Sequence, residues 1–96
     1  MKILRKEEIE TEHNCVVSDD VELECELSRA SGKACWYKDG ERLEENERFC
    51  VEEEGAFRSL IILNVDLEDS GEYFLDVLDD NITFMVKVQG TGLVTL

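Results

Sequence analysis

Hydrophobic and polar residues alternate along most of the chain, in short segments that polar turns separate. Residues 21–27 alternate strictly, and their hydrophobic positions are Val21, Leu23, Cys25 and Leu27. Successive side chains of a strand point to opposite faces of a sheet, so this segment predicts a strand with one buried and one exposed face.

The same kind of pattern predicts further strands along the chain. They cover 34–38, 48–53, 57–63, 72–78 and 82–88, and one or two edge strands are expected between 3 and 17. Turns are predicted at Asp39-Gly40, at Glu54-Gly55 and at 79–81, with a polar corner at 66–71. Short strands separated by polar turns are typical of an all-β sandwich.

The length of 96 residues is typical of one independently folding domain. We therefore expect a single domain over 1–96, in which 90–96 form a linker, a tail or the start of a neighbouring element. The longest apolar run, 60–63, is far shorter than the roughly 18 residues that span a bilayer. Residues 1–6 lack the apolar stretch of a signal peptide.

The charge is strongly negative, with 24 acidic and 10 basic residues and a net charge of −14. Such a surface repels phosphate backbones and anionic lipid headgroups, so neither nucleic acid nor a membrane is an expected partner. A basic protein surface is compatible with this charge. The acidity serves solubility equally well.

Several residues, in a fixed order along the chain, resemble the immunoglobulin superfamily. They are Cys25, Trp36 about ten residues later, Leu60 and Ile62, and then Asp69-Ser70-Gly71-Glu72-Tyr73. The resemblance covers about 15–89, where we expect the core. It implies an all-β, two-sheet, Greek-key sandwich of the intermediate (I-set) kind. The spacings between these residues do not follow the helical period of about 3.6 residues, which argues against a helical fold.

Each of these positions has a physical reason within that fold. Trp36 fills the space between two sheets that lie ~10 Å apart. Tyr73 fits a tyrosine corner, in which the buried ring bonds through its hydroxyl to upstream backbone. Asp69 accepts backbone hydrogen bonds in that turn, and Gly71 permits its tight geometry. The expected structural core comprises Cys25, Trp36, Leu60, Ile62, Asp69, Gly71, Tyr73 and Leu75.

One position departs from the pattern of extracellular immunoglobulin domains. Those domains carry a second cysteine two residues after the tyrosine, where this chain has Leu75. Cys25 therefore lacks the family's disulfide partner and is expected to pack as a small apolar residue. The loss suggests a reducing compartment, so we expect a cytoplasmic location. An extracellular adhesion or receptor domain is the less favoured alternative.

Two stretches narrow the resemblance within the I-set group. Residues 36–43 are similar to domains of titin, myomesin, obscurin and obscurin-like protein, and residues 52–60 favour the last two. The resemblance implies a cytoskeletal scaffold built from tandem domains, such as one of the sarcomeric M-band in the myofibril.

The four cysteines do not predict a disulfide. Trp36 points inward, so Cys35 points outward, whereas Cys25 points inward; the two thiols are therefore a poor pair. Cys35 and Cys50 are candidate redox-sensitive thiols, but no basic residue lies close enough to Cys35 to predict an unusually reactive thiol. The remaining cysteine, Cys15, belongs to the weakly patterned N-terminal part.

Catalytic, metal and cofactor sites are not predicted. The single histidine, His13, forms with Cys15 only two of the four ligands of a structural zinc site, and we expect it to face solvent on an edge strand. The acidic turn 79–81 lacks the spacing of a calcium loop. Asn81 begins a glycosylation sequon that matters only in secreted proteins, and we interpret it as a turn residue with positive φ. We expect no enzymatic activity, no cofactor and no small-molecule substrate.

Strand parity identifies a candidate partner surface on the outside of one sheet. Its residues are Cys35, Tyr37, Phe74, Leu78 and Met85. Apolar side chains on an exposed face of so acidic a chain favour a protein contact, rimmed here by Asp76 and Lys87. Isolated surface apolar residues are the ordinary alternative. An edge strand within 3–17, which contains no proline, is a second candidate surface.

Two classes of function follow from these observations. The first is a protein-interaction module of a cytoskeletal or sarcomeric scaffold, whose partner is an immunoglobulin or fibronectin-type domain of another cytoskeletal protein. The second is a passive spacer in a tandem array, with no ligand of its own.

Overall fold

A computed structural model describes residues 1–90 and shows two β-sheets packed face to face. One sheet has five strands in the order β1-β8-β7-β3-β4, and the other has three in the order β2-β6-β5. The strands are β1 (Glu12–Val16), β2 (Val21–Glu26), β3 (Ala34–Lys38), β4 (Glu41–Arg42), β5 (Phe49–Glu54), β6 (Phe57–Ile62), β7 (Gly71–Val77) and β8 (Asp80–Gln89). There are two short 3₁₀ helices: η1 (Lys6–Glu8) precedes β1, and η2 (Leu67–Asp69) lies between β6 and β7.

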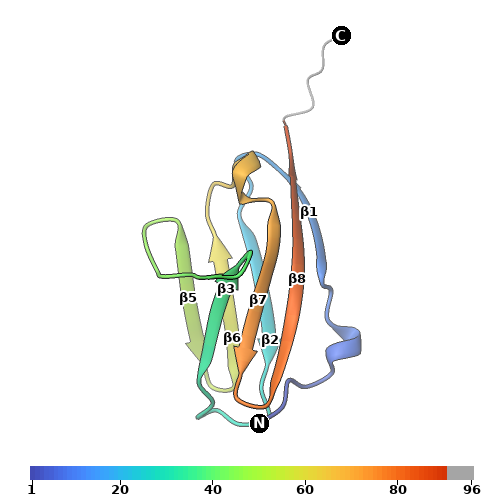
Figure 1. The fold of residues 1–96 in the computed structure, drawn as a ribbon, viewed down its shortest axis with the longest axis vertical. Coiled ribbons are helices and arrows are strands. Elements are labelled where there is room, and N and C mark those ends of the chain that lie inside the picture. The colour runs from blue at the N-terminus through green and yellow to red at the C-terminus, as the bar shows by residue number, and fades with distance from the viewer. Residues whose placement is uncertain (91–96) are drawn as a thin grey trace.

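The pairing of the first and last strands joins the two ends of the sequence (Figure 1). β1 runs parallel to β8, with His13 opposite Val86 and Cys15 opposite Val88. All other strand pairs are antiparallel, including β3 with β7, where Trp36 lies opposite Leu75. The predicted all-β, two-sheet immunoglobulin-like sandwich is confirmed.

The core lies between the sheets and consists of the inward residues of the alternating strands. β2 and β8 show the alternation most clearly, because buried and exposed positions follow one another along their length. The Trp36 and Phe84 rings lie 5.9 Å apart between centroids. Of the expected core residues, Cys25, Trp36, Leu60, Ile62, Asp69, Tyr73 and Leu75 are buried and Gly71 is partly buried.

The predicted strands agree with the observed ones to within two residues at most ends, and the last hairpin shows the clearest difference. β7 ends at Val77 and β8 begins at Asp80, so the turn is shorter and earlier than predicted. Asn81 is part of β8, opposite Asp76, and is not among the residues with positive φ. The interpretation of Asn81 as a positive-φ turn residue is therefore wrong. Asp39 and Gly40 do have positive φ, at 50° and 89°.

The N-terminal part contacts both sheets before β1 begins. Ile3 forms an isolated antiparallel bridge with Leu27 next to β2, and the chain then passes through η1 to pair with β8. The Ile3 side chain is buried and joins the core. The region 3–17 thus holds one strand and one bridge.

Two expectations concern the ends of the chain and its relation to a membrane. Of the predicted linker or tail at 90–96, only Gly90 lies within the described residues. Within residues 1–90, neither helix is long and apolar enough to cross a bilayer.

Candidate functional site

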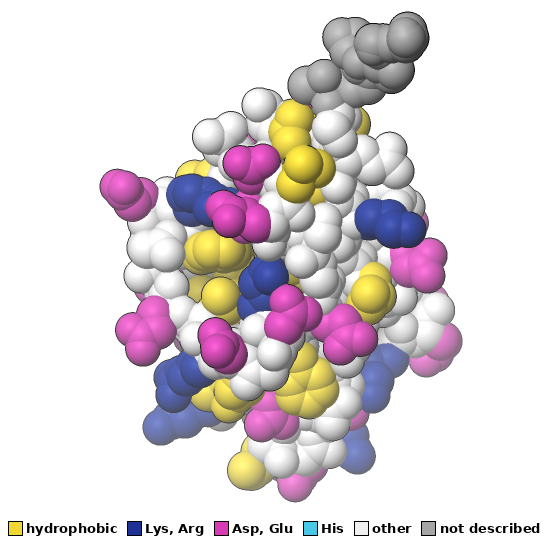
Figure 2. Space-filling view, turned by 45° about the horizontal axis from the view of Figure 1, so that its top comes forward, with side chains coloured by type: hydrophobic (Ala, Val, Ile, Leu, Met, Phe, Trp, Pro, Cys, Tyr) yellow, Lys and Arg dark blue, Asp and Glu magenta, His cyan; other side chains and the backbone are white. Residues whose placement is uncertain are grey.

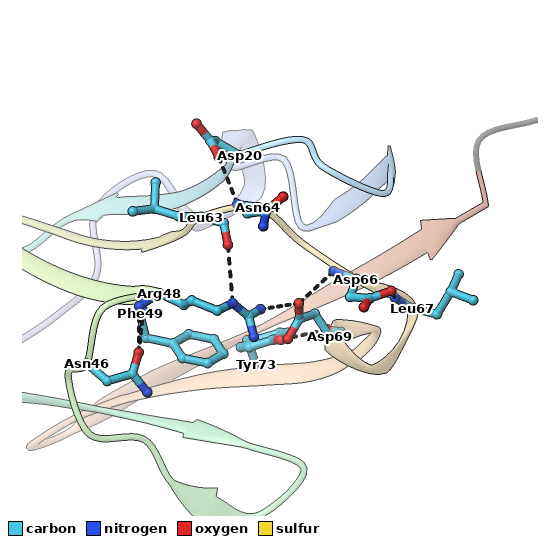
Figure 3. Close-up of polar contacts among 10 residues, drawn as sticks. All are labelled: Asp20, Asn46, Arg48, Phe49, Leu63, Asn64, Asp66, Leu67, Asp69 and Tyr73. Atoms are coloured by element: carbon cyan, nitrogen blue, oxygen red, sulfur yellow. Dashed lines mark hydrogen bonds and ion pairs between the residues drawn. The ribbon is translucent and has the colours of Figure 1, made fainter.

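A hydrogen-bonded corner lies where η2 leads into β7 (Figure 3). The Tyr73 hydroxyl donates to the backbone carbonyl of Asp69 at 2.6 Å, and the ring is fully buried. The Asp69 carboxylate accepts from the backbone N–H of Asp66 at 2.8 Å. Burial, followed by the nearby Asp69 charge, raises the pKa of Tyr73, so the phenol stays protonated and keeps donating. This corner stabilises the fold.

Arg48 completes the corner from the loop immediately before β5, and the sequence pattern alone did not identify this role. Its guanidinium forms an ion pair with the buried Asp69 carboxylate and donates from Nε to the Leu63 carbonyl at 3.4 Å. The same group lies 5.3 Å from the centroid of the Phe49 ring. The available signal was that Arg48 is the single basic residue in the acidic segment 44–54.

Gly71 leaves room for a carboxylate that joins two turns. Its φ is 151°, and a Cβ built at this position would lie 2.7 Å from Asp39 Oδ2. Asp39 Oδ1 accepts from the Glu72 N–H at 3.0 Å, and the Asp39 N–H donates to the Glu72 carbonyl at 2.9 Å. The Glu72 hydrogen bond, and then Lys38, lower the pKa of Asp39.

A buried arginine occupies the opposite end of the sandwich. Arg58 Nη2 donates to the carbonyls of Ala30 and Gly32 at 2.7 and 2.9 Å, and Nη1 donates to the Gly55 carbonyl at 2.8 Å. These bonds join the β5–β6 turn to the 29–33 loop, and they satisfy Nη1 and Nη2 of a charge that would otherwise be costly to bury, whereas the buried Nε has no hydrogen-bond partner within residues 1–90. Burial raises the pKa of the neighbouring Cys25 to about 11, although Arg58 opposes the shift.

The outer face of the five-stranded sheet brings three of the five candidate partner residues together. Tyr37 and Phe74 are directly opposite on β3 and β7, with ring centroids 6.1 Å apart, and both are partly exposed. Cys35 lies beside them, opposite Asp76.

The other two candidate residues lie further away. Met85 is on β8, opposite Glu72, and is 44% exposed. Leu78 is 84% exposed but lies in the turn beyond β7, outside the sheet face. Figure 2 shows hydrophobic side chains in separate groups among Asp and Glu side chains. The candidate surface is therefore an aromatic pair with one outlying methionine rather than a continuous patch.

Two shallow hollows lie on this outer face. One, of about 360 Å³, is lined by Tyr37, Gly40, Glu72, Phe74 and Asp76. The other, of about 340 Å³, lies beside β1 and β8, and its lining includes Glu12, His13 and Met85. Both hollows combine apolar and acidic walls.

The free edge of β1 is the second candidate surface. The Met85 N–H donates to the Thr11 carbonyl at 2.7 Å, and the Val17 N–H donates to the Gln89 carbonyl at 3.0 Å. By the alternation of a parallel ladder, the backbone groups of Glu12 and Asn14 point away from β8. At the end of the strand, the Val16 N–H donates to Asp19 Oδ2 at 3.0 Å, and the Val16 carbonyl accepts from the Asp19 N–H at 3.1 Å.

The sequence profile of the immunoglobulin I-set domain matches residues 7–80. This chain belongs to the I-set family. The match covers β1 to the start of β8, and so includes the corner and the Tyr37–Phe74 pair.

Known proteins similar to this I-set domain include titin and obscurin-like protein 1, which belong to the predicted group, and myosin-binding protein C, which was not among the predicted relatives. Human cardiac-type myosin-binding protein C is 39% identical over 62 residues, which are 62% of this chain and 5% of that protein. An immunoglobulin-like domain of human obscurin-like protein 1 superposes with a TM-score of 0.85 at 33% identity, covering 98% of this chain and 89% of that one. A tandem from titin gives 0.83 at 26% identity, covering 93% and 33%.

These similarities confirm the predicted relation to the titin and obscurin group of I-set domains. The chain spans only about 5% of the length of the curated relatives that it matches.

The four cysteines of the I-set domain are all free thiols in this structure. Cys25 is buried against the core, while Cys15, Cys35 and Cys50 are partly exposed. Burial, and then the charges of Asp19 and Asp69, raise the pKa of Cys15. That thiol is therefore less readily ionised than a solvent-exposed one.

His13 differs from the solvent-facing residue that was expected. Its ring lies 6.1 Å from the Phe84 ring between centroids and is partly buried, and Nε2 lies 3.0 Å from the Glu10 carbonyl. The expectation was wrong because β1 pairs with β8 so that His13 lies opposite the buried Val86 and Cys15 opposite the buried Val88. Both side chains therefore point toward the edge of the core. Among residues 1–90, no group of three or more His, Cys, Asp or Glu side chains is arranged to hold a metal ion.

Proposed function

We propose that this I-set domain is a non-catalytic protein-interaction module of a cytoskeletal scaffold protein. It contacts its partner through the outer face of the five-stranded sheet, and the partner is an immunoglobulin or fibronectin-type domain of another cytoskeletal protein. The observation that carries the proposal is the partly exposed Tyr37–Phe74 pair on a chain of net charge −14. The similarity to titin, obscurin-like and myosin-binding proteins supports a location at the myofibril or a related cytoskeletal structure.

The aromatic pair has the physical character of a binding anchor. Aromatic residues dominate the central, desolvated part of protein interfaces and contribute most of the binding energy there. The two rings lie in a regular sheet, whose strand pairing fixes their positions before a partner arrives. Little conformational entropy is therefore lost at the anchor when a complex forms.

The free edge of β1 supports a second mode of contact. The outward backbone N–H and C=O groups of Glu12 and Asn14 can form hydrogen bonds with an added strand. Residues 1–90 contain no proline that would prevent this pairing. The backbone groups of Val16 are already hydrogen-bonded to Asp19, so only a short stretch of β1 is free to pair with an added strand. We rank this edge below the sheet face for that reason.

A passive spacer is the alternative function. The titin structure similar to this chain is a tandem, and this chain covers 33% of it. A spacer requires only stable packing and contacts with its neighbours in the same protein.

The deciding experiment is a pull-down from muscle and non-muscle lysates with a face variant and a control variant. The face variant carries Tyr37→Lys, Phe74→Lys and Met85→Lys. The control variant carries Phe57→Lys and Ile61→Lys, two outward residues of β6 on the other sheet. Circular dichroism and urea unfolding check that both remain folded.

Each outcome distinguishes between the surfaces. Loss of a captured protein in the face variant alone supports the sheet face. If the face variant still captures the protein and Asn14→Pro does not, the contact lies at the edge of β1. Proline at position 14 removes an outward N–H and no bond to β8. Absence of any captured protein favours the spacer.

A further inference from the structure

Three side chains of β7 form an alternating row on the outer face. Glu72, Phe74 and Asp76 are two residues apart, so they share one side of the strand. Phe74 is the middle member and lies opposite Tyr37 on β3, with Gly40 opening space beside the rings. The hollow of about 360 Å³ is thus an aromatic pair with a carboxylate on each side.

The two carboxylates of this hollow have no cationic partner within the described part of the chain. Neither Glu72 nor Asp76 takes part in any of the ion pairs among residues 1–90. The nearby Lys38 is paired with Asp39 at 2.9 Å. Arg42, opposite Tyr37 on β4, is the basic residue that borders the hollow. The hollow therefore has two aromatic rings and an uncompensated negative charge.

We propose that this hollow receives an arginine side chain from a basic segment of the partner. The inference rests on the proposed function of the outer face and specifies the chemistry of its partner. A guanidinium stacks on an aromatic ring and donates bidentate hydrogen bonds to a carboxylate, so both kinds of wall are used at once. The compact lysine ammonium is a poorer match because it is more strongly hydrated and cannot stack as a plane.

The location of the basic border residue gives the bound segment a direction. Arg42 repels a cation on the β4 side and Lys87 repels one on β8 beyond Met85, whereas Glu72 and Glu12 extend the acidic surface across the sheet toward β8 and β1. The segment therefore crosses the sheet from the aromatic pair toward Met85, whose exposed side chain provides a second apolar contact.

The test is an NMR titration of the ¹⁵N-labelled domain with three blocked pentapeptides. Each peptide has glycines at positions one, three and five, and two arginines, lysines or citrullines at the remaining positions. Citrulline keeps the planar shape of arginine but carries no charge. We expect amide shifts centred on Tyr37, Phe74, Glu72 and Asp76 with arginine, roughly threefold weaker binding with lysine, and no saturable shift with citrulline.

Two double variants separate the hollow from general electrostatic attraction. Glu72→Gln with Asp76→Asn, and Glu52→Gln with Glu54→Gln on the other sheet, each remove two negative charges. The proposal requires that Glu72→Gln with Asp76→Asn weakens binding of the arginine peptide at least threefold. The fold-loss in Glu52→Gln with Glu54→Gln must be less than half as large. Equal losses in both, or shifts spread over the whole acidic surface, overturn it.

The lysate experiment distinguishes this inference from the proposed function. If the face variant loses the partner while Glu72→Gln with Asp76→Asn still binds it, the sheet face is the contact surface and the arginine proposal is wrong. A partner that the face variant retains overturns the sheet-face proposal itself, whatever the peptides do.

Discussion

Single residues at the corner hold backbone that would otherwise lack partners. The Tyr73 hydroxyl bonds the Asp69 carbonyl, and the Asp69 carboxylate in turn bonds the Asp66 N–H and Arg48. Buried groups of this kind contribute through the cost of leaving them unsatisfied more than through the net strength of each bond. One missing atom therefore has a measurable effect.

Tyr73→Phe removes that hydroxyl and leaves the Asp69 carbonyl without its donor. We expect the free energy of unfolding to fall by about 1–2 kcal/mol, measured by urea denaturation at pH 7. Tyr37→Phe is the control, since Tyr37 is partly exposed and its loss of a hydroxyl should change stability by less than about 0.5 kcal/mol. Equal effects at the two positions would contradict the role of the corner.

Gly71→Ala tests the contact between Gly71 and Asp39. The new Cβ would lie 2.7 Å from Asp39 Oδ2, on backbone with a φ of 151°. We expect a loss of about 2–3 kcal/mol in the free energy of unfolding. Part of this cost should disappear in an Asp39→Ala background, because the clash is then relieved. A cost unchanged by that background would place the whole penalty in the backbone conformation.

At the scale of elements, the strands with strict alternation were predictable and the edges were not. β2 has one dry and one wet face, which the strict alternation of its sequence records directly. β1 has no fully buried residue, so its parity depends on its parallel pairing with β8, a contact between positions more than 70 residues apart. His13 was misjudged for that reason. Arg48 and Arg58 were missed because their roles depend on loops brought together by the fold.

The Asp80 carboxylate, together with Asp79, holds the N-terminal segment to the β7–β8 turn. Asp80 accepts from the Ile3 N–H at 3.0 Å and from Lys6 Nζ at 2.7 Å. The Ile3 hydrogen bond, and then Lys6, lower the pKa of Asp80 to about 2. An unfolded aspartate has a pKa of about 3.9, so the stabilisation is present above that pH and is lost as the pH falls toward 2.

Asp80→Asn should therefore lower the free energy of unfolding at pH 6, and the difference from the unaltered chain should shrink between pH 4 and pH 2. Urea denaturation at four pH values over this range measures the difference. Asp76→Asn is the control, because Asp76 is exposed and forms no ion pair among residues 1–90, so it should change the free energy of unfolding at pH 6 by less than about 0.5 kcal/mol. A difference for Asp80→Asn that is constant from pH 6 to pH 2 would show that its carboxylate does not hold the segment.

At the scale of the whole molecule, the acidic surface suits a basic partner and opposes folding. The net charge of −14 is concentrated in places such as β5, where Glu52, Glu53 and Glu54 are consecutive and exposed. Like charges on a compact surface repel one another more than in the extended chain. The same charge that favours a basic partner therefore lowers the stability of the free domain.

Glu52→Gln with Glu54→Gln should raise the free energy of unfolding by about 0.5 kcal/mol in 20 mM salt, because it relieves repulsion between neighbours. The gain should fade near 0.5 M NaCl, where the screening length is only several ångströms. Glu53→Gln is the matched control of opposite sign, since Glu53 lies 3.6 Å from the buried Arg58 Nε and its loss should destabilise. Urea midpoints across a salt series measure all three chains. A gain that persists at high salt would assign the effect to strand propensity rather than to charge.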